Sequence, residues 1–148
     1  MSSQHACPTL GGNLSPQLQW NVAPAGTQTF VLLMEDPDFP QSGGAPASHW
    51  VVFNMPATRR SLPQGVPAGS SIADGGAQGA SQFTSISSGQ AYYGPCPPTG
   101  PAHRYNFRLY AVDVSLSIPS NATRAQVLAA MEGHIVGQAA LLGTFSRY

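Results

Sequence analysis

The chain has 148 residues, of which 42% are hydrophobic and only 8% are charged. This length suits a single domain over residues 1–148 with a well-buried core, and the composition argues against disorder. Six arginines and no lysines balance six acidic residues, so the formal net charge is zero. A nucleic-acid-binding domain would carry a basic excess on one face, so we expect no nucleic-acid partner.

Glycine and proline are abundant, with 16 and 14 residues, and they follow no regular repeat. This usage indicates many loops and favours a β-rich architecture over a helical bundle. No apolar run approaches the roughly 18 residues that span a bilayer, so we expect no transmembrane segment. Residues 1–5 contain neither the basic nor the apolar part of a signal peptide. We therefore expect a cytoplasmic protein, with a processed secretory form as the alternative.

The first half of the chain contains two strong strand patterns. A short strand is expected over residues 18–20, and the continuous apolar run 29–34 predicts a strand that is covered on both faces. Two prolines at 37 and 40 end it, because proline cannot donate to a strand ladder. The run 49–55 predicts a second strand, which Pro56 ends. Residues 57–100 are poor in periodic apolar positions, and we expect short strands or turns near 62–63, 72 and 82–83.

The second half begins with a third strong strand, predicted over residues 103–112. Alternation places His103 and Tyr105 on one face of this strand and Arg104 on the other. Thr123 and Gln126 then have the spacing of a capping box at the start of a helix. Glycines at 133 and 137 predict that this helix ends and that a short second helix follows. Residues 141–148 predict a final strand, so the fold class is mainly β with a few helices near the C-terminus.

Two cysteines, Cys7 and Cys96, lie in loops rich in glycine and proline. Two cysteines are too few for a structural zinc site. A disulfide between them is one interpretation, because the two loops could meet. Two unpaired thiols are the other, and a reducing compartment favours it.

Polar side chains stand at the ends of the predicted strands, beside prolines. They are Asp36, Asp38, His49, His103 and Tyr105. If they converge, one pocket holds two carboxylates, two imidazoles and a phenol. A neighbouring carboxylate raises the pKa of an imidazole, and imidazolium and phenol groups donate hydrogen bonds to anions. The sequence therefore predicts a site for a phosphate or carboxylate group.

The same residues also have structural interpretations. Asp36 and Asp38 can cap a turn through their own backbone, and His49 can be a satisfied strand-end histidine. Arg104 is expected to pair with an acid rather than to touch a ligand, and His134 is expected to be structural. Two aspartates and two histidines could hold a hard metal ion. The flanking prolines favour a rigid ligand slot instead, so we predict neither a metal nor a cofactor.

Common signatures of enzymes are missing from the sequence. It contains no G-x-S-x-G elbow, no H-E-x-x-H, no Walker loop and no G-x-G-x-x-G after a strand. We therefore expect a protein that is not an enzyme. A weak hydrolase that uses His103 as a base is the last-ranked alternative, because no activated nucleophile is visible.

Several blocks of the sequence, in the same order and spacing over residues 7–147, resemble the phosphatidylethanolamine-binding protein family. Asp36-Pro37-Asp38-Phe39-Pro40 resembles the motif D-P-D-x-P, and residues 49–56 resemble H-W-V-V-x-N-x-P. Residues 94–100, followed by His103-Arg104-Tyr105, resemble G-P-x-P-P-x-G and H-R-Y. The opening of the bacterial and archaeal branch of Raf kinase inhibitor-like proteins is resembled by Cys7, residues 12–16, Trp20 and residues 24–27. Ser81-Gln82-Phe83-Thr84 stands where the family has an Asn-Asp-Phe-Gly-like turn.

The resemblance implies a β-sandwich-like core of antiparallel or mixed sheets with a few peripheral helices. The family's anion pocket would fall on Asp36, Asp38, Pro40, His49, Pro97, Pro98, His103 and Tyr105, with Gly94 and Pro95 shaping its wall. Members of the family bind phosphate, phosphorylated lipid headgroups and similar anions, some inhibit serine proteases or kinases, and bacterial relatives often form homodimers. We therefore expect a binding module for small anions with a regulatory role. The alternative is an inhibitor or scaffold that acts on an unknown protease or kinase through surface loops.

Overall fold

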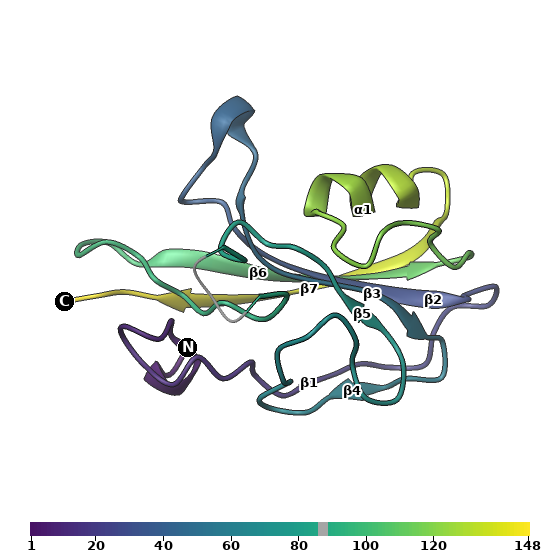
Figure 1. Cartoon of the computed structure of the whole chain (residues 1–148), viewed down its shortest axis with the longest axis horizontal. Helices are drawn as coiled ribbons and strands as arrows, with labels where there is room; N and C mark the ends of the chain where they lie inside the picture. Colours follow the sequence, from purple (N-terminus) through teal and green to yellow (C-terminus); the bar gives the residue numbers. More distant parts are fainter. Residues whose placement is uncertain (86–88) are drawn as a thin grey trace.

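The computed structural model describes residues 1–85 and 89–148, which form two antiparallel sheets, one α-helix and two short 3₁₀ helices. The helix covers one face of the larger sheet, and the smaller sheet covers the opposite face (Figure 1). The mainly β fold with a helix near the C-terminus is confirmed. The described residues contain a single α-helix where a few helices were expected, and both of their sheets are purely antiparallel.

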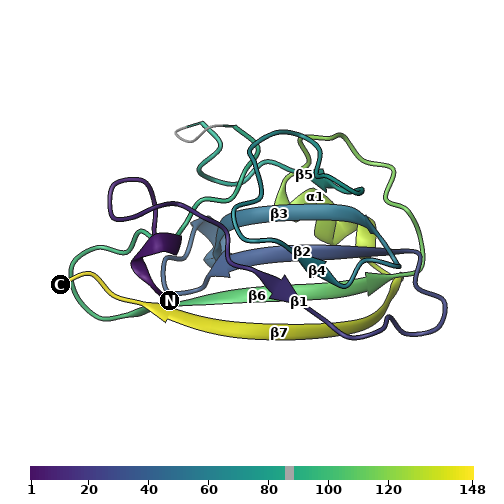
Figure 2. The ribbon, with the colours of Figure 1, turned by 90° about the horizontal axis from the view of Figure 1, so that it is seen from below.

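The larger sheet has five strands in the order β5-β3-β2-β6-β7, and β1 pairs with β4 in the smaller sheet. The elements are η1 Ser3–His5, β1 Leu18–Gln19, β2 Thr29–Asp36, η2 Ser42–Gly44, β3 Ala47–Pro56, β4 Ser61–Leu62, β5 Ala77–Gln78, β6 His103–Val112, α1 Arg124–Met131 and β7 Ile135–Phe145. The predicted strands over 29–34, 49–55 and 103–112 are thus confirmed. Figure 2 shows the strands of the larger sheet side by side, with β1 and β4 lying across one face of that sheet.

Strand β2 lies in the centre of the larger sheet, and all eight of its residues are buried. Phe30, Leu32 and Met34 belong to the core cluster that includes Leu18 of β1 and Leu62 of β4. Val31 and Leu33 belong to the second cluster, which includes Val127 and Met131 of α1. This central position explains the unbroken apolar run of residues 29–34. Alternate side chains of β2 point to opposite faces of the sheet, and each face is covered by a different layer of the protein.

The expected second helix after Gly133 is wrong, since residues 135–145 form β7. Gly133 has a φ of +80° and ends the helical segment. Ile135 then begins a strand that pairs with β6 as far as Phe145, opposite His103. The apolar spacing of α1 extends to Ile135 in the sequence, but pairing with β6 outweighs that local pattern.

The stretch that was hardest to interpret contains little regular structure. The short strand expected near 62–63 is confirmed as β4, Ser71 next to residue 72 makes an isolated bridge with Ala77, and residues 82–83 lie in a turn. β5 was not predicted. No helix in the described part of the chain is long and apolar enough to cross a membrane.

Candidate functional site

Asp36 and His103 meet where β2 ends and β6 begins. The two strands are antiparallel, with Glu35 opposite Asn106, so the end of one adjoins the start of the other. Nδ1 of His103 donates a hydrogen bond of 2.8 Å to Oδ2 of Asp36. Only 3% of the Asp36 side chain and 13% of the His103 side chain are exposed. The pair is therefore a mostly buried carboxylate and imidazole.

His49 lies near the start of β3 and is almost fully buried, with 2% of the residue exposed. Its Nδ1 donates to the carbonyl oxygen of Tyr93 at 2.8 Å. The ring packs edge-on against Tyr105 and at a tilt against Phe83, with centroid distances of 5.4 and 4.6 Å. Burial lowers the pKa of His49, although the Tyr93 carbonyl and the charge of Asp36 oppose this. The expected rise in imidazole pKa is thus wrong for His49, because desolvation outweighs the nearby carboxylate.

Tyr105 lies beneath this histidine in the core. Its residue is fully buried, and its hydroxyl makes no hydrogen bond with the part of the chain that the structure describes. Burial raises the pKa of the phenol, and the nearby charge of Asp36 adds to the effect. Tyr105 therefore stays a neutral side chain that supports the ring of His49 from below.

Asp38 lies outside this buried group, in an ion pair on the surface. Its carboxylate accepts hydrogen bonds from Nη2 and Nε of Arg104, at 2.7 and 3.0 Å, and from the backbone N–H of Arg104 at 2.7 Å. These bonds lower the pKa of Asp38 to about 2. The expected pairing of Arg104 with an acid is confirmed. Asp38 thus orients the start of β6 rather than an imidazole.

A cavity of about 200 Å³ opens beside the two histidines. Its lining residues are Asp36, Phe39, His49, Phe83, Tyr93, Cys96, Pro97, Pro98 and His103. Of the predicted site residues, Asp36, His49, Pro97, Pro98 and His103 line this cavity, whereas Asp38, Pro40, Gly94, Pro95 and Tyr105 do not. The cavity therefore has two imidazoles and one carboxylate, with aromatic rings and prolines around them.

Four lining residues were not predicted, and all lie inside or beside the motifs. They are Phe39, Phe83, Tyr93 and Cys96. The ring of Phe83 stacks on that of Tyr93 with centroids 4.4 Å apart, which forms an aromatic wall. Phe39 lies within the first motif, Cys96 lies within the third, and Tyr93 directly precedes it. For these three residues, the position beside the motif prolines was the available signal; Phe83 lies in the turn of residues 81–84, which contains no proline.

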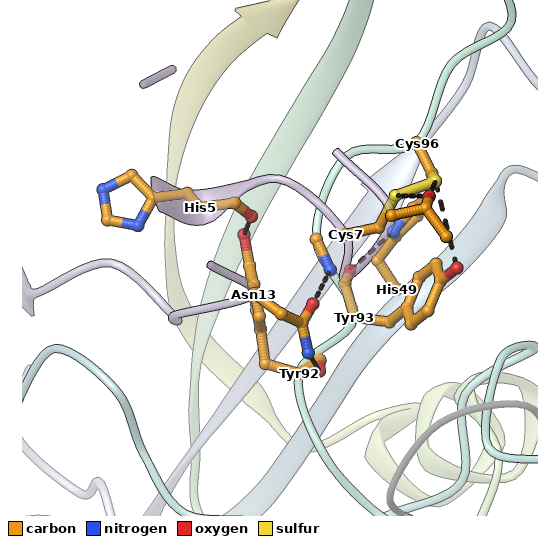
Figure 3. The surroundings of a disulfide bond; sticks show 9 residues. His5, Cys7, Asn13, His49, Tyr92, Tyr93 and Cys96 are labelled. Carbon is orange, nitrogen blue, oxygen red and sulfur yellow. Dashed lines mark hydrogen bonds between the residues drawn. A yellow bond between two sulfur atoms is a disulfide. The ribbon is translucent and has the colours of Figure 1, made fainter. Parts of the chain in front are cut away.

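A disulfide joins Cys7 to Cys96, with 5.4 Å between their Cα atoms (Figure 3). Of the two interpretations of the cysteines, the structure adopts the disulfide. The N–H of Cys7 donates to the carbonyl of Pro95 at 3.0 Å, and the N–H of Gly94 donates to Oδ1 of Asn13 at 2.9 Å. The N-terminal segment thus holds the loop that forms one wall of the cavity.

Gly94 shows how closely the two segments approach. A Cβ atom at this position would collide with the carbonyl oxygen of His5. The hydroxyl of Tyr92 donates to the same carbonyl at 2.8 Å, as Figure 3 shows. Gly94 and Pro95 were predicted to shape the wall of the cavity, but they do not line it themselves; they lie between the lining residues Tyr93 and Cys96 in the chain.

Two other ion clusters lie away from the cavity. Glu35 is buried and accepts hydrogen bonds from Nε of Arg108 at 3.1 Å and from Nε of Arg124 at 2.8 Å. Nδ1 of His134 donates to Asp113 at 2.8 Å, and both side chains are exposed.

A larger cavity, of about 540 Å³, lies next to Arg59 and Arg60, and neither His49 nor His103 lines it. Within residues 1–85 and 89–148, no three His, Cys, Asp or Glu residues are grouped to hold a metal ion.

Comparison with protein families gives a match over nearly the whole chain. The family model for phosphatidylethanolamine-binding protein matches residues 1–146. A UPF0098 protein of Methanothermobacter thermautotrophicus is 40% identical over 145 residues, which cover 98% of this chain and 89% of the relative. The UPF0098 protein YbhB of Escherichia coli is 38% identical over 138 residues, or 92% of this chain and 84% of the relative. A lipoprotein candidate of Mycobacterium tuberculosis, LppC, is 36% identical over 137 residues, or 91% and 61%.

Solved structures agree with these sequence relationships. YbcL of Escherichia coli, described as a member of the mammalian PEBP family, superposes with a TM-score of 0.87 at 29% identity, covering 100% of this chain and 91% of YbcL. A homologue of phosphatidylethanolamine-binding protein from Chlamydia trachomatis gives a TM-score of 0.83 at 33% identity, covering 99% and 89%. The fold is thus shared with these proteins.

Proposed function

The chain belongs to the phosphatidylethanolamine-binding protein family, and from this premise we propose that its cavity binds a small anion: phosphate, a phosphorylated headgroup or a carboxylate. The observation that carries the proposal is the pairing of His103 with the buried Asp36 at the cavity wall. Nδ1 of His103 is engaged by the carboxylate, so Nε2 is the nitrogen that contacts a molecule in the cavity. A proton on Nε2 makes the ring a cation that Asp36 balances and gives an N–H donor for an anion.

The composition of the cavity wall supports a binding module rather than a hydrolase. Among the described residues that line it there is no serine, threonine or lysine, and its sulfur, in Cys96, is bonded to Cys7. Nucleophilic catalysis needs an activated hydroxyl, thiol or amine within reach of a base. The prolines and aromatic rings instead make a rigid apolar wall, which suits the organic part of a small ligand. We therefore propose that the protein binds its ligand without converting it and acts in regulation.

The test is a calorimetric titration of the protein with inorganic phosphate. The change His103→Ala removes the proposed charged donor and should weaken phosphate binding by about 1.5–3 kcal/mol, or roughly tenfold to hundredfold. His134→Ala is the matched control, because His134 has the same Nδ1-to-carboxylate bond but lies away from the cavity. It should leave the affinity unchanged.

Equal affinity of wild type and His103→Ala would remove the cavity from the function. An equal loss in His134→Ala would show that the effect is a general loss of positive charge. Thermal melts of both variants establish that they are folded before the titrations are compared. A regulatory effect on a protease or kinase that survives His103→Ala would favour the alternative, an inhibitor that acts through surface loops.

A further inference from the structure

Two neighbouring arginines, Arg59 and Arg60, lie in the chain between β3 and β4. The sequence has six arginines and no lysine, and Arg104, Arg108 and Arg124 form ion pairs with acids. Within residues 1–85 and 89–148, Arg59 and Arg60 instead donate only to backbone carbonyl oxygens. An arginine keeps its charge in a protein, so these two charges remain available to a further acid.

The hydrogen bonds hold both guanidinium groups in place and leave part of each group over. Nε of Arg59 donates to the carbonyl oxygen of Ser61 at 2.9 Å. Its Nη1 donates to the carbonyl oxygens of Ala73 and Gly75, at 2.8 and 3.1 Å. Nη1 of Arg60 donates to two nearby backbone carbonyl oxygens, at 2.7 and 2.8 Å. Nη2 of Arg59, and Nε and Nη2 of Arg60, thus have no hydrogen bond to a described residue.

Both arginines line the cavity of about 540 Å³, which has the size of a typical small-molecule site. Part of its wall is apolar, since Leu62, Val66 and Ile72 line it and are buried in the core cluster beneath the smaller sheet. The cavity therefore places two cations beside an apolar surface. This combination suits a ligand that has an acidic group and a hydrocarbon part.

Asp74 determines how much negative charge the cavity can take. It lies between the two carbonyl groups that Nη1 of Arg59 binds, it lines the same cavity, and it forms no ion pair with a described residue. The charged groups among the described lining residues are thus two guanidinium groups and one carboxylate, with a net charge of +1. A ligand with one negative charge balances this net charge, whereas a phosphate dianion exceeds it.

We infer that the cavity beside Arg59 and Arg60 is a second binding site, which takes an organic carboxylate with an apolar body. The carboxylate accepts hydrogen bonds from Nη2 of Arg59 and from Nε or Nη2 of Arg60, in the planar geometry that guanidinium and carboxylate groups share. The hydrocarbon part packs on Leu62, Val66 and Ile72. This site is separate from the cavity of His49 and His103, because the two cavities have no lining residue in common.

The experiment compares octanoate, octanol and acetate by calorimetric titration into the wild-type protein at about pH 7.5, where carboxylates are ionised. Octanoate has both the charge and the apolar chain, octanol has only the chain, and acetate has only the charge. Octanoate should bind at least about tenfold more tightly than either of the others. Equal binding of octanol would overturn the role of the arginines, and equal binding of acetate would overturn the role of the apolar wall.

Three variants test the residues. Arg60→Gln removes one guanidinium group and should weaken octanoate binding roughly tenfold to hundredfold. Arg147→Gln is the matched control and should leave the affinity unchanged, because Arg147 is exposed and does not line this cavity. Asp74→Asn should raise the affinity about two- to fivefold, since it removes a negative charge beside the bound carboxylate. Asparagine adopts the φ of +66° at this position as aspartate does.

A measurement on the wild-type protein locates the site even if Arg60→Gln does not fold. Octanoate should shift the NMR signals of the Nε–H groups of Arg59 and Arg60 and leave that of Arg147 in place. Shifts confined to other arginines would overturn the site, as would an octanoate affinity of Arg60→Gln equal to that of wild type. An equal loss in Arg147→Gln would reduce the effect to general charge attraction and overturn the site too. An affinity that does not rise in Asp74→Asn would overturn the position of the carboxylate.

Discussion

Histidines in this protein share one type of contact and differ in what surrounds it. His49, His103 and His134 each donate from Nδ1 at 2.8 Å, to a backbone carbonyl, a buried carboxylate and an exposed carboxylate. The same side chain is therefore almost fully buried in His49, paired with a buried carboxylate in His103 and exposed at the surface in His134. Burial and the partner determine these roles, and neither is visible from the residue type alone.

Glu35 stands directly before Asp36 in the chain, yet it faces the opposite side of the sheet. Successive residues of a strand alternate between faces, so Glu35 lies on the side of α1 and Asp36 lies at the cavity. Its carboxylate is bound by Arg108 of β6 and Arg124 of α1. Sequence reasoning missed this cluster, because the three residues are far apart in the chain and match no motif.

We predict that Glu35→Gln lowers the free energy of unfolding by about 2 kcal/mol, because it removes the charge from a buried acceptor of two guanidinium groups. Urea denaturation measures the change. Asp113→Asn is the control, since Asp113 pairs with His134 at the surface, and it should cost under about 1 kcal/mol. An unfolding midpoint for Glu35→Gln equal to that of wild type would show that the cluster adds nothing to stability.

At the scale of elements, α1 is only eight residues long and needs its ends satisfied to remain a helix. Thr123 accepts a hydrogen bond from the N–H of Gln126, and the side chain of Gln126 accepts one from the N–H of Thr123. Both bonds were predicted from the spacing of the two residues, because a capping box is a local pattern.

Removing this cap should therefore destabilise the protein. Thr123→Ala is expected to lower the free energy of unfolding by about 1 kcal/mol. Chemical denaturation followed by circular dichroism checks this value. Thr58→Ala is the matched change at an exposed position outside any helix and should stay within about 0.5 kcal/mol of wild type. If both variants unfold at the same denaturant concentration, the cap does not limit stability.

Local patterns predicted the strands at the centre of the sheet, but at the β7 edge they predicted a strand only from residue 141 onward, whereas β7 begins at Ile135. The runs that became β2, β3 and β6 are strongly apolar or alternate, so their residues indicate a strand by themselves. β7 contains small residues and two glycines, at 137 and 143, and it lies beside α1 in sequence. Its strand structure comes from the partner β6, which residue periodicity does not encode.

On the scale of the whole molecule, the disulfide closes a loop between positions 89 residues apart and ties the N-terminal segment to the cavity wall. Closing so long a loop restricts the unfolded chain strongly. We predict that replacing both Cys7 and Cys96 by serine lowers the free energy of unfolding by about 2–5 kcal/mol. Thermal and urea unfolding with and without reductant measure it.

The double variant also provides the control for this experiment. Reductant should destabilise the wild-type protein and have no effect on the variant, which has no cysteines left. A wild-type unfolding curve that does not respond to reductant would contradict the predicted contribution of the disulfide. A disulfide is typical of proteins in oxidising compartments, so a location in the cytoplasm stays a prediction.

The sequence by itself determined the central strands, the helix cap and the motif residues, because each depends on neighbours in the chain: an apolar run, a capping pair or a proline-flanked polar group. The tertiary structure alone decided that Asp38 pairs with Arg104 at the surface, that Asp36 holds His103, and that burial keeps His49 neutral. It also decided that the last strand, predicted only from residue 141, begins at Ile135. These outcomes depend on which groups meet across the sheet and on how much water remains around them, and both are set only when distant segments pack together.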